Sequence, residues 1–131
     1  MQTRLFNYEN DYEIVSKWWK ERNHAVITKD FLSDYGVIAL KDNKPVGVMW
    51  LYPIMTAKWC MIRFPIVDPN VSKETRDTAL NLIFDNLHNI SRDMGYNNIF
   101  CTTNHPGLIE RLKKYNYTLD SENCAHFWGG L

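Results

Sequence analysis

Three apolar, strand-like runs follow one another between residues 35 and 67 with only short connections between them. They are YGVIAL (35–40), VGVMWLYPIM (46–55) and KWCMIRFPIV (58–67). Asp42 and Asn43, between the first two runs, are residue types that occupy tight hairpin turns. Runs joined by such short connections pair as antiparallel neighbours. The pattern therefore predicts three consecutive antiparallel strands.

The longest helix of the chain is predicted over residues 75–94. Its apolar residues recur at spacings of three and four: Leu80, Ile83, Phe84, Leu87, Ile90 and Met94. Gly95 follows them, and glycine commonly ends a helix in the left-handed conformation. Pro106 opens a second helix, which Asn116 is expected to close in the same way.

Shorter patterns complete the order of elements. Residues 3–6 are expected to form a first strand, and residues 11–22 a helix that Asn10 or Asp11 caps. A helical turn is expected after Thr28, and NNIFCTT (97–103) indicates another strand. The tail YTLDSENCAHFWGGL indicates one or two more strands. This order predicts one three-layer α/β domain over residues 1–131. Its sheet is expected to be mixed, mostly antiparallel and six- to seven-stranded, with helices on both faces.

Composition excludes some broad classes of function. Fifteen basic and fifteen acidic residues cancel, so no overall charge drives the chain toward nucleic acid or membranes. The three cysteines are widely spaced and odd in number, and with the four histidines they form no metal-binding pattern. The N-terminus lacks an apolar signal region, and no apolar run approaches the ~18 residues of a membrane span. We therefore expect a soluble, cytoplasmic protein.

Three segments carry a resemblance to a known family. VDPNVSKETRDTALNLIF has a Val, then a Pro two residues on, then an Ala-Leu pair inside the helix. NHPGLIERLKKYNY and the hairpin DNKPVGVMWLY match further parts of the same pattern. Together with the order of elements, these segments resemble the GNAT superfamily of acyl-CoA-dependent N-acyltransferases. WWKERN and the general layout look, more loosely, like small GNAT-like proteins encoded by bacteriophages.

The resemblance implies a fold, a reaction and a coenzyme. It implies a GNAT-like acyltransferase domain that transfers an acyl group from acetyl-CoA, or another acyl-CoA, to an amine without a metal. The acceptor is left open and includes a modified nucleobase or a protein. Nucleic acid therefore enters only as a substrate, and a phage origin would imply the host cytoplasm.

The resemblance also implies where the coenzyme binds. Pro65 inside a strand run indicates a bulge or an edge, because proline cannot donate to a strand ladder. The bulge of the fourth GNAT strand would leave the amides of Ile66 and Val67 for the pantetheine arm. The pyrophosphate loop would lie between Val71 and Arg76.

That loop lacks the family's glycines, but its own residues also suit an anion. Ser72 and Thr75 supply hydroxyl groups, Lys73 and Arg76 supply positive charge, and a helix N-terminus favours anions. The alternative makes Ser72 an ordinary helix cap, with Lys73 and Arg76 solvated. Asp77 stands where the family usually has a small residue, and it would repel a pyrophosphate that it faced.

Catalytic candidates come from the late segment. Asn104 and Tyr115 lie where the resemblance places the thioester and the proton donor, although Arg111 occupies the family's usual general-acid tyrosine position. His105, directly after Asn104, is a candidate for the proton acceptor that the fourth strand lacks. Asn104 could instead cap the helix that follows it. The strand that often carries the family's general base contains Arg63 and no acidic residue.

Three residues are substrate-binding candidates: Trp19, Tyr52 and Arg63. Trp18 and Trp19 point about 100° apart on a helix, so only one is expected to lie deep in the core. The other would line a substrate cleft or a base-stacking surface, or it would be a partial core residue. Arg63 would repel an ammonium group and suit an anion, or it could lie exposed on the outer face.

The sequence is consistent with two functions. One is an acyl-CoA-dependent N-acyltransferase, and the other is a GNAT-like binding or regulatory module without turnover. A homodimer is a further possibility if the C-terminal run HFWGGL forms an exposed strand edge.

Overall fold

The computed structural model describes residues 1–131 as two compact units, Met1–Cys101 and Thr102–Leu131. The first unit contains β1 (Gln2–Leu5), α1 (Tyr8–Glu21), the 3-10 helix η1 (Lys29–Phe31), β2 (Tyr35–Lys41), β3 (Lys44–Pro53), β4 (Trp59–Val67), α2 (Lys73–Asp93) and β5 (Asn98–Cys101). The second unit contains α3 (Pro106–Lys114). None of the three α-helices combines the length and the apolar composition that crossing a bilayer requires.

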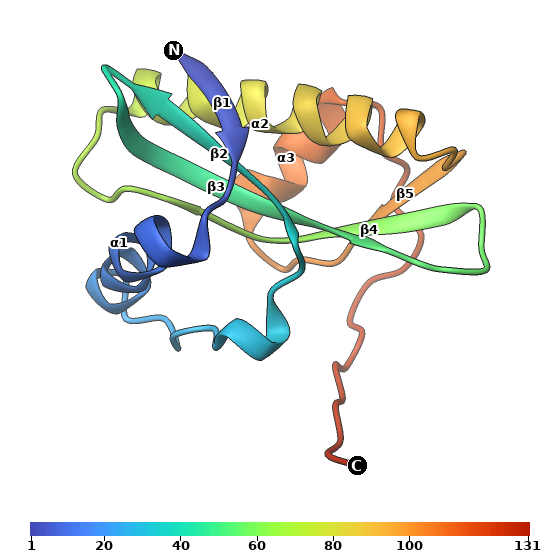
Figure 1. The fold of residues 1–131 in the computed structure, drawn as a ribbon. Helices are drawn as coiled ribbons and strands as arrows, with labels where there is room; N and C mark the ends of the chain where they lie inside the picture. The colour runs from blue at the N-terminus through green and yellow to red at the C-terminus, as the bar shows by residue number, and fades with distance from the viewer. The chain divides into compact units, whose positions relative to one another are not determined.

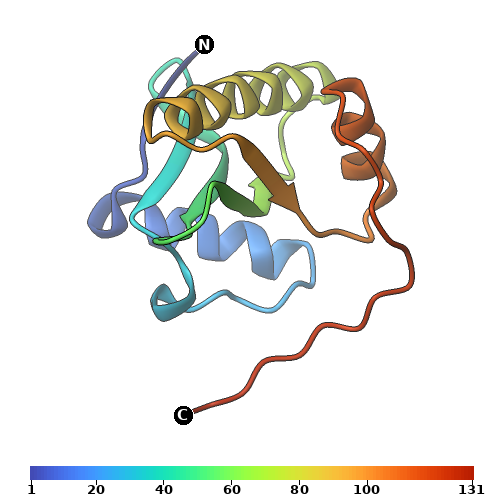
Figure 2. The same cartoon turned by 90° about the vertical axis from the view of Figure 1, so that its right-hand side faces the viewer.

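The first unit is a five-stranded sheet between two helices. The strand order is β1-β2-β3-β4-β5, antiparallel from β1 to β4 and parallel between β4 and β5. Figure 1 shows α1 and α2 on opposite sides of this sheet, and the rotated view in Figure 2 shows the same sandwich. Asp42 and Asn43 take φ angles of 50° and 61° in the β2–β3 turn, the two left-handed residues that a tight hairpin needs.

The expected fold class is confirmed, and the expected number of strands is wrong. The sheet has five strands rather than six or seven, because residues 118–131 contain no strand. In this tail the polar stretch DSEN separates two apolar pieces that are each too short to alternate over a strand. The strand edge expected at HFWGGL is therefore also absent.

Each face of the sheet has its own core. On the α2 face, buried strand residues such as Met49, Leu51 and Ile62 lie under the buried stripe of α2, which includes Ile83 and Phe84. The α1 face holds a second cluster of buried side chains: Phe6, Val15, Trp18, Trp19, Leu32, Ile38, Val48, Trp50 and Ile66.

Both tryptophans of α1 are core residues. Trp18 and Trp19 are 5% and 3% exposed, so the expectation that only one of them could lie deep is wrong. Trp19 stacks on Trp50 with ring centroids 6.1 Å apart. Val26 and Ile27, in the segment between α1 and β2, pack against the same cluster.

All three helices end on a left-handed residue. Asn23, Gly95 and Asn116 have φ angles of 55°, 88° and 64°. In each case the next amide donates back into the last turn, for example from Tyr96 to the Ser91 carbonyl at 3.0 Å. The expected endings at Gly95 and Asn116 are confirmed.

The start of α1 differs from the expectation. The helix begins at Tyr8, and the side chain of Asn7 accepts hydrogen bonds from the amides of Glu9 and Asn10. Neither Asn10 nor Asp11 is the cap, because an earlier asparagine satisfies the first free amides.

Asp11 instead joins β1 to α1. Its carboxylate accepts two hydrogen bonds from the Arg4 guanidinium, at 2.7 and 2.9 Å, and a third from the Asn7 amide at 2.7 Å. Burial alone would raise the pKa of the Asp11 carboxyl, but the hydrogen bonds from Arg4 and Asn7 outweigh it and hold this pKa below its ordinary value.

The ion pair yields a stability prediction. We expect Asp11→Asn to reduce the free energy of unfolding at pH 7 by about 2 kcal/mol, below the cost of breaking a fully buried pair because the Arg4 side chain is 41% exposed. A carboxylate with a lowered folded pKa stabilises above its unfolded pKa of ~3.9 and loses this contribution as the pH falls through its folded pKa. The difference between the two proteins should therefore shrink below about pH 4.

Urea unfolding at pH 7 and at pH 3 measures this difference. Glu13→Gln, on the exposed side of α1, is the control and should change stability by less than about 0.5 kcal/mol. Equal stability of Asp11→Asn and wild type at pH 7 would contradict a stabilising role for the pair.

Candidate functional site

The sheet divides at β4, whose first half pairs with β5 and whose second half does not. Parallel pairing with β5 ends at Ile62, opposite Cys101, while antiparallel pairing with β3 continues to Val67. Beyond Ile62, the side of β4 that faces away from β3 has no strand partner. We call this point the fork, and Arg63 is the first residue beyond it.

Just beyond the fork, β4 carries one extra residue. Val48 lies opposite Ile66 and Trp50 lies opposite Arg63, so two steps along β3 (50 − 48) match three along β4 (66 − 63). The bulge that Pro65 predicted is therefore present, in a strand that lies inside the sheet rather than at its edge.

Phe64, inside this bulge, has a strained backbone. Its φ of 60° is rare for a bulky residue and costs of order 1–3 kcal/mol. Pro65 disfavours the right-handed helical conformation at the preceding residue, which an ordinary bulge would use. Two contacts hold the ring in place: an edge-to-face contact with Tyr52 at 6.0 Å, and the Arg63 guanidinium at 4.6 Å from the ring centre.

The direction of the backbone distinguishes the two amides that were expected to hold pantetheine. The Asp68 amide donates to the Val46 carbonyl at 3.0 Å, so Asp68 faces β3. The backbone N–H and C=O groups of successive strand residues point to alternate sides. Those of Val67 therefore point away from β3, and those of Ile66 point toward it. Of the two, Val67 has its N–H on the unpaired side of β4, where the Val67 carbonyl accepts from Arg22 Nε at 3.3 Å.

The connection from β4 to α2 ends in a free helix N-terminus. Ser72 caps α2 by accepting a hydrogen bond from the Thr75 amide at 3.1 Å. Ser72, Lys73 and Glu74 are exposed, and their backbone N–H groups make no hydrogen bond within the protein. Residues 68–72 contain no positive φ angle, so the conformation of the loop does not require glycine.

Cationic side chains surround this N-terminus. Lys41, at the end of β2, donates from Nζ to Thr75 Oγ1 at 3.1 Å, although no sequence pattern connects these two residues. Arg76 is half-buried, and its Nε is buried without a hydrogen-bond partner. Thr75 is itself 6% exposed, so its hydroxyl serves Lys41 and Ser72 rather than an outside ligand. Asp77 is the fifth residue of α2, about 6 Å along the axis from the free amides.

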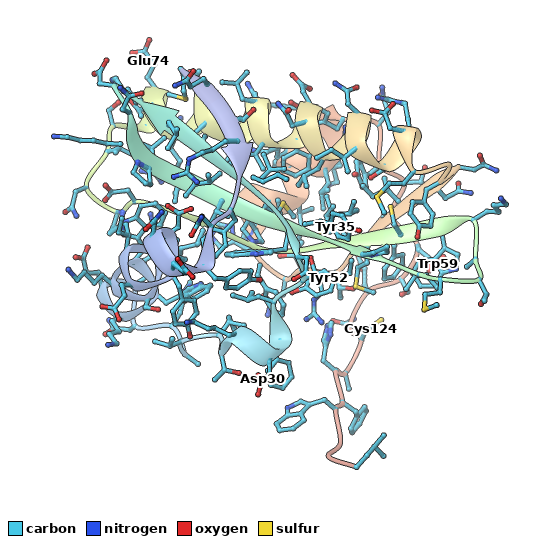
Figure 3. All side chains as sticks on the ribbon, in the orientation of Figure 1. Asp30, Tyr35, Tyr52, Trp59, Glu74 and Cys124 are labelled. Atoms are coloured by element: carbon cyan, nitrogen blue, oxygen red, sulfur yellow. The ribbon has the colours of Figure 1, made fainter.

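Tyrosines fix the segment between α1 and β2. Their hydroxyls donate to backbone carbonyls: Tyr8 to Ser33 at 2.5 Å, Tyr12 to Ile27 at 2.9 Å and Tyr52 to Phe31 at 2.6 Å. In Figure 3, Tyr52 lies above η1, the helical turn that contains Asp30. Burial raises the pKa values of Tyr8 and Tyr52, so both phenols are protonated at neutral pH. We call this segment, residues 22–34, the clamped segment.

The structure separates the three predicted substrate-binding residues. Tyr52 and Arg63 both contact the Phe64 ring at the bulge. Trp19 is almost fully buried against Trp50 and is a core residue rather than part of a cleft.

The predicted catalytic residues belong to the second unit. His105 caps α3 by accepting the Leu108 amide at Nδ1, 3.3 Å away, so its neutral ring carries the proton on Nε2. The capping role suggested for Asn104 is therefore wrong, and Asn104 is exposed. Tyr115 is the C-cap of the same helix.

Cys60 and Cys101 are protonated thiols, and no metal cluster is present. Burial raises the pKa of the Cys101 thiol to about 11, which excludes a thiolate nucleophile at neutral pH. Burial also raises the pKa of Cys60, which is fully buried. No group of three or more His, Cys, Asp or Glu side chains could hold a metal ion.

Two shallow hollows lie away from the fork. One of about 210 Å³ is lined by Met1, Gln2, Leu40 and the β2–β3 turn. The other, of about 120 Å³, lies at the C-terminal end of α2. Neither contains the unpaired backbone of β4 or the N-terminus of α2, so the candidate site is defined by strand geometry rather than by a hollow.

Known structures share this fold at low sequence identity. An acetyltransferase from Trypanosoma brucei has a TM-score of 0.70 at 13% identity, over 97% of this chain and 99% of that one. Rv2747 from Mycobacterium tuberculosis, in complex with CoA and NLQ, has a TM-score of 0.68 at 17% identity, over 86% of this chain and 70% of that one. A transcriptional regulator from Bacillus halodurans C-125 has a TM-score of 0.73 at 12% identity, over 97% of this chain and 99% of that one.

These likenesses establish the fold. No protein-family model and no curated protein matches the sequence. The chain has the fold of GNAT-type acetyltransferases, as expected from the sequence. The looser likeness to phage-encoded proteins finds no support in these structures.

The clamped segment provides a prediction. We expect Tyr52→Phe to lower the free energy of unfolding by about 1 kcal/mol, the net value of one hydrogen bond, and to speed proteolysis within residues 22–34. Tyr35→Phe is the matched control, because the Tyr35 hydroxyl makes no hydrogen bond and the residue is 38% exposed. Urea unfolding and timed digestion measure both effects, and equal cleavage rates in the two variants would show that Tyr52 does not fix the segment.

Proposed function

We propose that this chain is an acyl-CoA-dependent N-acyltransferase with acetyl-CoA as its donor. The observation that carries the proposal is the second half of β4, which lacks a strand partner and leads directly into the free N-terminus of α2. A ligand with an amide-bearing arm and a pyrophosphate matches this succession of groups. The CoA complex of a neighbour with the same fold supports the choice of coenzyme.

The residues present fit such a coenzyme. The N–H of Val67 would pair with the pantetheine arm. Ile66 would instead hold this part of β4 in the sheet by pairing with Val48 of β3. The free amides of Ser72, Lys73 and Glu74 would receive the pyrophosphate, favoured by the α2 dipole by about 0.3–1 kcal/mol. Arg76 has an Nε that lacks a partner, and a phosphate oxygen would supply one. When bound, the coenzyme supplies the activated acyl group as a thioester.

The roles proposed for Lys41 and Thr75 are indirect. Lys41 places a positive charge at the N-terminus of α2, where the helix dipole already opposes a cation. A bound anion would relieve this repulsion. Thr75 would position Lys41 and Ser72 rather than touch the coenzyme itself.

Acyl transfer also requires a neutral amine and a proton for the departing sulfur. Tyr115 is proposed as the proton donor and Asn104 as the residue near the thioester, as the resemblance implies. His105 is the weaker candidate for a base, because its Nδ1 already accepts the Leu108 amide. β4 carries no carboxylate, so the ammonium group of the acceptor has to lose its proton without a base on that strand.

A binding module without turnover is the second candidate. It is favoured by the lack of acidic residues on β4, and the fold also occurs in a protein described as a transcriptional regulator. The two candidates share coenzyme binding and differ in turnover. Release of free CoA across a panel of amines separates them.

Coenzyme binding is tested by thermal unfolding with acetyl-CoA. A ligand at 100 times its dissociation constant adds about 2.7 kcal/mol, which raises the melting temperature of a domain of this size by roughly 10 °C. We expect Arg76→Glu to abolish the shift, because the substitution removes a group that donates hydrogen bonds to the phosphate and adds a negative charge at the site.

Arg92→Glu is the matched control, since Arg92 lies on the same helix but in its last turn. Calorimetry should find unchanged affinity for acetyl-CoA in this variant. No stabilisation of the wild type at millimolar acetyl-CoA would overturn the proposed function. Unchanged binding in Arg76→Glu would remove Arg76 from the site.

A further inference from the structure

Arg63 is a cation without an anionic partner at the fork. It forms no ion pair and no hydrogen bond, and its guanidinium carbon makes a cation–π contact with the Phe64 ring at 4.6 Å. The residue is half-buried, so part of its hydration is lost without a protein group in exchange. A cation in this condition is stabilised when an anion binds.

The position of Arg63 makes it available to a ligand at the fork. It follows Ile62, the last residue of β4 that pairs with β5, and it lies opposite Trp50 on the α1 face of the sheet. The guanidinium carbon lies over the Phe64 ring, and no protein group accepts a hydrogen bond from the guanidinium. Its N–H donors lie along the edge of the guanidinium plane and stay free for a planar anion.

Arg63 has no carboxylate within ion-pair distance, and the strands around it carry none. β3, β4 and β5 contain no Asp or Glu. The titratable groups that Arg63 affects are Tyr52 and Cys101, whose pKa values burial keeps high, so both are neutral at pH 7. Arg63 therefore places an unpaired positive charge at the fork.

We propose that the acceptor is an amine that also carries an anionic group, a carboxylate or a phosphate, which pairs with Arg63. This inference rests on the proposed acyl transfer and names its substrate class. The guanidinium would bind the anion through two parallel hydrogen bonds.

The same cation assists the reaction at the amine. A nearby positive charge lowers the pKa of an ammonium group, so more of the bound acceptor is the neutral amine that can attack. Overall, an amine N–H bond and the thioester C–S bond are replaced by an amide C–N bond and a thiol S–H bond. Atoms and charge balance without a further reactant, and no carboxylate on β4 is needed.

The experiment compares acceptors that differ in one charge. Phenylalanine is compared with phenylalaninamide, and glucosamine 6-phosphate with glucosamine, by release of free CoA from acetyl-CoA. We expect the anionic member of at least one pair to have a kcat/KM about 10- to 100-fold higher, the range for a charge-assisted hydrogen bond. The pair that shows the preference identifies carboxylate or phosphate as the anion.

Variants assign the preference to Arg63. Arg63→Gln should remove most of it by raising KM for the anionic acceptor, with little change for the neutral one. Arg63→Lys should restore part of it, because it keeps the charge but loses the planar fork. Lys58→Gln, an exposed charge in the loop just before β4, is the matched control and should behave as wild type.

A binding measurement keeps the test independent of turnover. Calorimetry of each acceptor with protein saturated in CoA should show tighter binding of the anionic member, lost in Arg63→Gln. Equal binding and equal kcat/KM within both pairs would overturn the inference while leaving the proposed function intact. Failure of acetyl-CoA to stabilise the wild type, in the thermal test above, would instead overturn the proposed function.

Discussion

The extra residue in β4 is the constraint on which the rest of the site depends. Because Phe64 and Pro65 occupy the space of one residue opposite β3, β4 changes register within one sheet. Pairing with β5 ends just before this bulge, at Ile62. This divergence leaves the backbone N–H and C=O of Val67 pointing away from β3 without a strand partner. Ser72, the N-cap of α2, follows five residues later. One local irregularity thus brings an unpaired strand edge and a helix N-terminus into succession.

The bulge is costly, and the α1 face stabilises it. Phe64 adopts a left-handed backbone that a residue of its size rarely takes, and its ring contacts both Tyr52 and Arg63. Tyr52 is held in turn by its hydrogen bond to the clamped segment. Strain of this kind persists only where surrounding contacts outweigh it, and such residues concentrate at functional sites. The clamped segment therefore links the core of the α1 face to the geometry of the fork.

Charge, rather than acid–base groups, distinguishes the site. Around the N-terminus of α2, Lys41, Lys73 and Arg76 suit an anionic coenzyme, and the loop reaches its conformation without glycine. At the fork, the side chain that a family resemblance would make a base is a cation. The proposed reaction is consistent with both features, because a cation that binds the acceptor's anion also favours its neutral amine.

Local interactions made much of this structure readable from the sequence. The hairpin at Asp42 and Asn43, the helix ends at Gly95 and Asn116, and the bulge at Pro65 each depend on the conformational preferences of one or two residues, and each is present. The strands expected in residues 118–131 are absent, because the short apolar pieces of this tail have only a weak local preference for a strand. The resemblance to the GNAT superfamily combined these local patterns into a predicted fold, and the structure has that fold.

Contacts between distant residues were decided only by tertiary structure. Packing buries both Trp18 and Trp19, draws Asp11 into a pair with Arg4, and brings Lys41 to Thr75 across 34 positions of sequence. Strand register, not residue type, selects Val67 over Ile66 as the outward amide. The sequence by itself determined which elements form and where they turn, because those choices depend on neighbours within a few residues. Which side chains meet depends on how the sheet and helices pack, and no local pattern contains that information.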